Sequence, residues 1–185
     1  MTTALLIVDM LNDFVDGTLA NAAAKPTVEP IARLAEAARR ADWPVIYAND
    51  AHQQGDLEFA VFGEHALAGS DGAAVIPDLA PAASDLVVPK RFYSSFTSTD
   101  LDATCRVHGI DSLVLVGQHT DCCCRHTTYD AFLRGIAMTV VSDATCVYEP
   151  VDPATVEERQ QQALQYLGFY YNARIADSDT VLAQG

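Results

Sequence analysis

Three consecutive cysteines, Cys122, Cys123 and Cys124, are the most reactive feature of the sequence. They follow an apolar run, residues 110–116, that is typical of a buried strand. Successive helical side chains point about 100° apart, so three in a row do not converge on one ion. Neighbouring cysteines also form strained disulfides. The run therefore predicts one nucleophile with two small buried hydrophobic neighbours.

A carboxylate and an amine elsewhere in the chain could activate this thiol. Cysteine attacks as a thiolate, which the unpaired N–H groups of a helix N-terminus favour. Asp9 and Lys90 each end an apolar run of strand length. Alone, the first could cap a turn and the second could be solvated. Together with one cysteine they favour a catalytic triad, in which the carboxylate takes the thiol proton and the amine balances the charge.

A second group has the residue types of a metal site. Asp50 and His52 follow another strand-like run, and His65 lies further along the chain. These three side chains could hold a zinc, iron or manganese ion and leave positions open for substrate. The alternative places Asp50 in a turn, His52 in an exposed loop and His65 as a hydrogen-bonding residue of the pocket. We expect no organic cofactor.

The elements that must position these residues alternate along the chain. Apolar runs of strand length occupy residues 3–9, 44–50, 85–90, 112–117, 137–143 and 173–177. Helical patterns occupy residues 28–42, 97–109, 121–135 and 152–168, and the last three each close with a glycine suited to a helix C-cap. Residues 53–83 are rich in glycine and less regular. This order predicts a three-layer α/β/α sandwich on a parallel sheet of about six strands.

Length and charge limit what the protein does. A chain of 185 residues, half of them hydrophobic, is expected to form a single domain over residues 1–185. Eleven basic against twenty-five acidic residues give a net charge of −14, which makes nucleic acid and membrane surfaces poor partners. The five cysteines are odd in number and clustered, unlike a secreted disulfide framework. We expect a cytoplasmic protein with reduced thiols.

Three stretches of the chain, residues 5–20, 87–96 and 113–135, resemble the signature regions of the isochorismatase-like cysteine hydrolases, the superfamily that includes the nicotinamidases. The third stretch is the most specific, and its matching positions are Gly117, Thr120, Asp121, Cys123, Thr127, Asp130 and Ala131. The chain departs from the usual pattern at Ala51, Phe62, His119, Cys122 and Cys124. The resemblance supports the same α/β fold.

The resemblance implies roles for individual residues. Cys123 becomes the nucleophile, with Asp9 and Lys90 as its partners, and the N–H groups of His119 and Cys123 form the oxyanion hole. A cis peptide bond is expected between Gln118 and His119. His126 is interpreted as a packing or capping residue, with a Cys123–His126 dyad as the alternative. The family's metal triad corresponds to Asp50, His52 and His65.

The predicted reaction is hydrolysis of a small amide through a thioester, with release of ammonia. Phe14, Leu19, Phe62 and Tyr93 are candidates for the walls of the substrate pocket, although each could belong to the core. Nicotinamide or a similar amide is the first candidate substrate, and a carbamoyl or ureido compound is the second. An ether-cleaving or metabolite-binding relative would share the fold, and a redox sensor would share the thiol run. We also expect a homo-oligomer.

Overall fold

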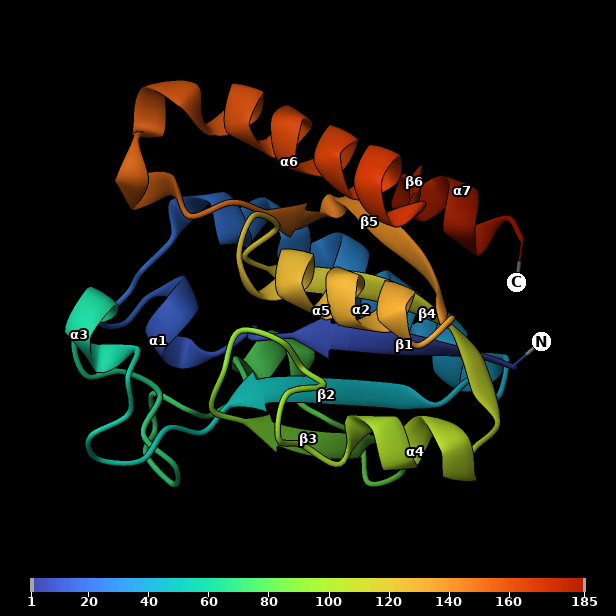
Figure 1. Ribbon diagram of the computed structural model, residues 1–185, viewed down its shortest axis with the longest axis horizontal. Coiled ribbons are helices and arrows are strands. Elements are labelled where there is room, and N and C mark those ends of the chain that lie inside the picture. Colours follow the sequence, from blue (N-terminus) through green and yellow to red (C-terminus); the bar gives the residue numbers. More distant parts are fainter. Residues whose placement is uncertain (1, 185) are drawn as a thin grey trace.

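The computed structural model describes residues 2–184, which form one parallel sheet of six strands (Figure 1). The strands are β1 (Thr2–Val8), β2 (Val45–Asp50), β3 (Leu86–Lys90), β4 (Ile110–Gln118), β5 (Ala137–Cys146) and β6 (Arg174–Ala176). Their spatial order is β3-β2-β1-β4-β5-β6, and every neighbouring pair is parallel. The strand order therefore reverses between β1 and β4, where ligands bind in open α/β sheets.

The central strands are apolar on both faces because helices cover both sides of the sheet. From β1, Leu6 and Val8 pack into one hydrophobic cluster, and Leu5 and Ile7 pack into the other. The first cluster contains residues of α4 (Leu101–Val107), α5 (Cys123–Leu133) and α6 (Val156–Tyr171), and the second contains residues of α2 (Val28–Arg40) and α7 (Ser178–Leu182). The predicted three-layer sandwich is thus confirmed. No helix within residues 2–184 is both long and apolar enough to cross a membrane.

Two of the three predicted C-cap glycines follow the end of their helix, and the third lies inside its helix. Gly109 and Gly135 follow α4 and α5 with φ of 63° and 69°, as C-cap glycines do. Gly168 was expected to end the last long helix, but α6 continues past it to Tyr171. The residue that adopts the left-handed conformation after α6 is Asn172, with φ of 54°. Asparagine tolerates this conformation, so the helix does not need to stop at the glycine.

The irregular segment after β2 covers the carboxyl end of the sheet. It contains α3 (Phe59–Phe62) and the short 3₁₀ helix η2 (Pro77–Leu79). Figure 1 shows α3 beside α1 (Asn12–Val15), at the end to which the strand arrows point. A small apolar cluster joins these parts, and its buried members are Leu11, Phe14, Leu19 and Ala66. The remaining 3₁₀ helices are η1 (Ala22–Thr27), η3 (Glu149–Val151) and η4 (Pro153–Thr155).

Gly117 is required where β1 and β4 come closest. It pairs with Val8 and has φ of 105°, and a Cβ added to it would lie 2.1 Å from the carbonyl oxygen of Val8. We predict that Gly117→Ala lowers the free energy of unfolding by at least about 2 kcal/mol more than Gly135→Ala does. Gly135 also has positive φ, but no atom lies within 4 Å of its added Cβ. Urea unfolding of both variants measures the difference, and equal losses would contradict the prediction.

Candidate active site

Three elements bring the predicted triad together at the carboxyl end of the sheet. Asp9 follows β1, Lys90 is the last residue of β3, and Cys123 is the first residue of α5. The Nζ of Lys90 lies 2.7 Å from Oδ2 of Asp9 and donates to the Sγ of Cys123 at 3.7 Å. All three side chains are buried. Lys90 thus contacts both other members, and polar atoms of Asp9 and Cys123 lie within 4.8 Å of one another. The catalytic roles of the three residues stay predictions.

The ammonium of Lys90 is held between two carboxylates. Besides Asp9, it contacts Oδ1 of Asp50 at 2.6 Å. Burial lowers the pKa of Lys90, but Asp50 and Asp9 outweigh it and keep that pKa well above its ordinary value. Burial has the opposite effect on a carboxyl group and raises the pKa of Asp50. Lys90 and His52 outweigh burial here and hold the pKa of Asp50 below its ordinary value. Lys90 is therefore a cation and Asp50 an anion at neutral pH.

Asp9 differs from Asp50 because its pKa is close to neutrality. Burial, followed by the negative charge of Asp50, raises the pKa of Asp9 to about 7, against the opposing effect of Lys90. Its Oδ1 accepts the backbone N–H of Asp50 at 2.8 Å, which fixes the carboxyl group in the site. A carboxyl group with such a pKa both accepts and releases protons near neutral pH.

The three cysteines occupy different environments. Cys123 faces Lys90, and Cys124 lies in the hydrophobic core. Cys122 was predicted to be a second buried hydrophobic residue, and this holds only in part. It packs against the core but is partly exposed and lines the active-site cleft. Cys122 immediately precedes α5, so its backbone is not yet helical and its side chain reaches the cleft.

Cys122 and Cys123 affect one another's pKa. The neighbouring thiol of Cys123 lowers the pKa of Cys122 to about 6, helped by His126 and Lys90. The thiol of Cys122, together with burial, raises the pKa of Cys123 well above its ordinary value, although Lys90 opposes this. Cys123 is nevertheless the thiol that contacts Lys90.

His126 contacts Cys122 and not the thiol of the proposed nucleophile, Cys123. Its Nδ1 donates to the backbone carbonyl oxygen of Cys122 at 2.8 Å, and its ring lies 5.3 Å from that of Tyr93. Among the hydrogen bonds of residues 2–184, none joins His126 to the Sγ of Cys123. These contacts favour the packing and capping interpretation of His126 over the Cys123–His126 dyad.

The peptide bond between Gln118 and His119 is cis, as the resemblance implies. Burial lowers the pKa of the His119 side chain to about 4, so this imidazole is neutral. Its ring packs between Phe14 at 5.7 Å and Tyr148 at 5.1 Å. Within residues 2–184, neither the N–H of His119 nor that of Cys123 donates to a backbone carbonyl. Both N–H groups are thus available as the predicted oxyanion-hole donors.

A narrow cleft opens at Cys123. All four predicted wall residues line it, and the complete lining is Phe14, Leu19, Asp50, Glu58, Phe62, His65, Tyr93, His119, Cys122, Cys123 and Tyr148. Four larger cavities lie elsewhere among the described residues, and none of the three triad residues lines them. The sequence interpretation missed Tyr148 and Glu58, which lie in segments without a recognisable motif.

A buried amide pair connects the cleft wall to the base of the site. Asn21 donates to Oε1 of Gln118 at 3.1 Å and to the carbonyl oxygen of Val147 at 3.0 Å, and it accepts the N–H of Glu149 at 3.0 Å. Gln118 in turn donates to the carbonyl oxygen of Asp9 at 3.2 Å. This network fixes the segment that carries Tyr148 relative to β1 and β4. Asn21 was not predicted, because nothing in a loop sequence marks a contact 126 residues away.

The α5 residues of the signature fix the loop that follows Lys90. Oγ1 of Thr127 accepts the N–H of Ser95 at 2.9 Å, and Asp130 accepts the hydroxyl of Ser94. The loop between Lys90 and Ser94 carries Tyr93, whose side chain lines the cleft. The motif therefore serves to position this wall of the cleft as well as the nucleophile.

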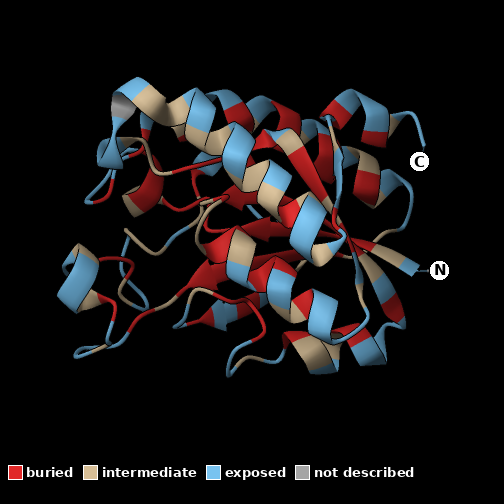
Figure 2. Cartoon of the chain, turned by 45° about the horizontal axis from the view of Figure 1, so that its top comes forward, coloured by how far each residue is buried: buried red, intermediate tan, exposed pale blue. Residues whose placement is uncertain are grey.

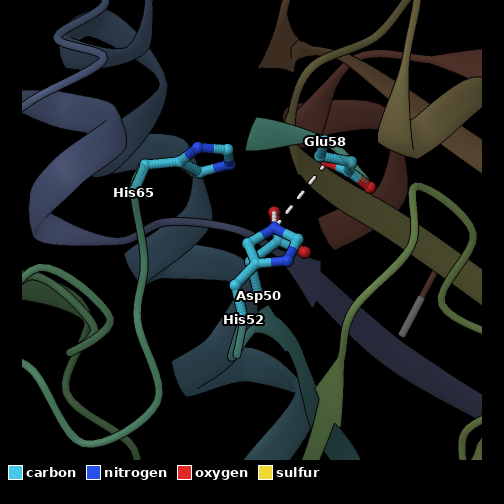
Figure 3. A group of neighbouring side chains, drawn as sticks. All are labelled: Asp50, His52, Glu58 and His65. Atoms are coloured by element: carbon cyan, nitrogen blue, oxygen red, sulfur yellow. Dashed lines mark ion pairs between the residues drawn. The ribbon is translucent and has the colours of Figure 1, made fainter. Parts of the chain in front are cut away.

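The predicted metal ligands converge on one point, with a fourth residue beside them. Ligand atoms of Asp50, His52, Glu58 and His65 all lie within 4.8 Å of one another, and all four residues are buried. Figure 3 shows Glu58 and His65 on opposite sides of Asp50 and His52. The Nε2 of His52 is 3.6 Å from Oδ2 of Asp50 and 3.7 Å from Oε2 of Glu58. Burial, with the charge of Asp50, raises the pKa of Glu58 to about 7.

The hydrogen bonds of this group fit a divalent ion. His52 donates from Nδ1 to Asp56 at 2.9 Å, and its Nε2 is buried without a hydrogen-bond partner within residues 2–184. His65 donates from Nδ1 to the carbonyl oxygen of Gly63 at 2.8 Å, so its Nε2 is left to bind an ion. Metal-binding histidines are oriented in this way by an acceptor behind the ring. The alternative that placed His52 in an exposed loop is wrong, since its side chain is fully buried.

Comparison with known proteins defines the family. The isochorismatase domain matches residues 3–179, and the chain belongs to this family. N-carbamoylsarcosine amidase from Thermoplasma acidophilum, whose crystal structure is known, is 40% identical to this chain in sequence. The two structures superpose with a TM-score of 0.87 over 97% of this chain and 98% of that one.

Two curated relatives widen the comparison. Nicotinamidase 3 of Arabidopsis thaliana is 28% identical over 95% of this chain and 85% of its own length. The ureidoacrylate amidohydrolase of Stutzerimonas stutzeri is 30% identical over 77% of this chain and 69% of its own length. These names denote hydrolases of C–N bonds, in agreement with the enzyme class that the sequence predicts.

Metal binding by the four-residue group can be measured without any substrate. We predict that one Zn²⁺ or Mn²⁺ per chain binds to chelator-treated protein and raises its melting temperature, because the ion binds only the folded chain. Glu58→Gln and His65→Ala should each weaken binding at least tenfold, since each removes a ligand. Glu64→Gln is the matched control, because Glu64 is exposed and bonds to Gln54. Calorimetric titration showing no saturable binding to the wild type would contradict the metal site.

Proposed function

We propose that the protein is a cysteine amidohydrolase that cleaves the C–N bond of a small neutral amide similar to nicotinamide and releases ammonia. The observation that carries the proposal is the position of the Lys90 ammonium, 2.7 Å from the Asp9 carboxylate and 3.7 Å from the Cys123 thiol. This arrangement combines a nucleophile, a base with a pKa of about 7 and a fixed cation at one end of the cleft.

The first half of the reaction forms a thioester. Asp9 takes the proton of Cys123, and the thiolate attacks the amide carbonyl carbon. The N–H groups of His119 and Cys123 stabilise the resulting oxyanion. As the C–N bond breaks, Asp9 returns the proton to the leaving nitrogen, and ammonia departs. Lys90 stays protonated throughout and stabilises the thiolate and the Asp9 carboxylate.

The second half regenerates the enzyme. Ammonia leaves Asp9 ionised, so this carboxylate can take a proton from a water molecule as the water attacks the thioester carbonyl. The same two N–H groups hold the second oxyanion. The C–S bond then breaks, the carboxylic acid product leaves, and the proton on Asp9 returns to the sulfur of Cys123.

The lining of the cleft favours a flat, uncharged substrate. Phe14, Phe62, Tyr93 and Tyr148 provide aromatic walls, and Asp50 and Glu58 contribute the carboxyl groups of the lining. Within residues 2–184, no arginine or lysine lines the cleft, and Lys90 beneath it is already paired with two carboxylates. A substrate carboxylate would therefore lack a partner among the side chains of the described residues, and only an ion held beside the cleft would offer one.

Asp50, His52, Glu58 and His65 would hold a divalent ion at one side of the cleft. The chemistry that such an ion supplies when bound is attraction for a ring nitrogen or another polar atom of the substrate. Asp50 would then serve both this group and Lys90, with Oδ2 toward His52 and Oδ1 toward the ammonium.

The second candidate substrate class is a small N-carbamoyl or ureido compound. Its support is the 40% identity with N-carbamoylsarcosine amidase over nearly the whole chain. The same triad would attack the carbamoyl carbon and release ammonia from it. The two classes differ in that the named carbamoyl substrate carries a carboxylate, for which the described lining of the cleft offers no free cation.

A panel of neutral amides and N-carbamoyl acids tests the proposal through ammonia release. We expect turnover of nicotinamide or a similar neutral amide and no detectable turnover by Cys123→Ala. Cys124→Ala should retain most of the activity, because Cys124 is buried in the core away from the cleft. Mass spectrometry of trapped enzyme should place the acyl group on Cys123. An acyl group found on Cys122 would overturn the assignment, and turnover of carbamoyl acids alone would select the second candidate.

The pH dependence reports on Asp9. Because the base acts in its ionised form, kcat/KM should rise with pH and level off above the Asp9 pKa of about 7. Below that pH the rate should fall roughly tenfold per unit. Asp9→Asn should lower kcat by several orders of magnitude with the fold intact. Asp16→Asn is the control, since Asp16 is exposed and pairs with Lys25. A flat profile between pH 5 and 8 would remove Asp9 as the base.

A further inference from the structure

The C-terminal part of α6 is uncharged and yet poorly buried. Residues 160–171 contain no Asp, Glu, Lys or Arg, in a chain that has 36 such residues. Leu167 is nevertheless the only fully buried residue of α6. Figure 2 shows this helix pale blue and tan along nearly all its length. A helix with this composition ordinarily packs against another surface.

Aromatic side chains connect this part of α6 to the C-terminal half of α5. Ring centroids are 5.3 Å apart for Tyr129 and Tyr171 and 5.5 Å apart for Tyr166 and Tyr171, and Tyr170 continues the series at 4.5 Å from Tyr166. We call the whole surface the aromatic face, which comprises Tyr129, Phe132 and Leu133 of α5 with Tyr166, Phe169, Tyr170 and Tyr171 of α6. It contains six of the fifteen aromatic residues of the chain.

The aromatic face exposes a large apolar area. Phe169 is 82% exposed, Tyr170 and Leu133 are each 59% exposed, and Phe132 is 48% exposed. With Tyr129, these side chains present on the order of 500 Å² of surface, given about 150–250 Å² for each aromatic residue. The largest apolar patch of a typical monomer is about 300–600 Å², and such a patch often has a function. A standard interface needs about 800 Å² from each partner, so these side chains would supply more than half of it.

We propose that the aromatic face is the contact between two copies of this chain. Each copy carries a net charge of −14, so two copies repel one another unless they meet where carboxylates are absent. The exposed side chains of the aromatic face are all uncharged. A twofold axis through this face would place like against like, which suits aromatic stacking and requires no charge complementarity.

The border of the aromatic face has the polar character of an interface rim. The guanidinium of Arg125 lies 4.0 Å from the ring centre of Tyr166, and Arg134 lies 4.7 Å from that of Phe96. Gln162 and Gln165 line a shallow groove beside Phe169 and Tyr170. Arginine and aromatic residues are enriched at such contacts, while acidic residues are depleted.

Sedimentation of the full chain tests this contact. We expect the wild type to be a dimer, or a larger assembly built from dimers, at micromolar concentration. Phe169→Glu on α6 and Leu133→Glu on α5 should each raise the dissociation constant at least tenfold, because each places a carboxylate in the contact. The melting temperature of the wild type should rise with protein concentration, and that of the variants should rise less.

Val107→Glu is the matched control, because Val107 is 81% exposed but lies on α4 outside the aromatic face. It should sediment like the wild type. Circular dichroism identifies any variant that fails to fold, and the other variant then decides. A wild type that is monomeric at about 100 μM, or an assembly that survives both substitutions, would overturn the proposal.

Discussion

The buried ammonium of Lys90 is the interaction on which the rest of the site depends. Charged groups leave water only at a large cost in free energy, and the cost is offset when opposite charges and hydrogen bonds surround them. Here Asp9 and Asp50 provide that environment from the ends of β1 and β2, next to the end of β3. One cation between two carboxylates leaves an excess of negative charge, and burial together with this excess raises the pKa of Asp9.

Asp50 links the triad to the neighbouring group of proposed metal ligands. Its two oxygens face different partners, Lys90 on one side and His52 on the other. Any change in the charge of Asp50 therefore alters the proton affinity of Asp9 as well. The proposed base and the proposed binding group cannot be tuned independently, which gives Asp50 a role in both without direct participation in proton transfer.

Much of the fold could be predicted because it depends on local patterns. Six apolar runs became six parallel strands, and the strand ends brought Asp9, Lys90 and Cys123 together without any knowledge of loops. Glu58 and Asn21 could not be predicted in this way, because their positions depend on how irregular segments fold back over the sheet. The exposure of Cys122 could not be predicted for another reason. The direction of its side chain depends on whether α5 begins at Cys122 or one residue later, at Cys123.

The unequal exposure of Cys122 and Cys123 has a consequence for chemical probes of this protein. Alkylating reagents select a thiol that is both acidic and reachable, and Cys122 is partly exposed with a lowered pKa, whereas Cys123 is buried. A bulky adduct there would block the cleft and abolish turnover although the labelled sulfur takes no part in bond making. Inactivation by such a reagent would thus point to the neighbour of the nucleophile, and only a substrate-derived adduct distinguishes the two.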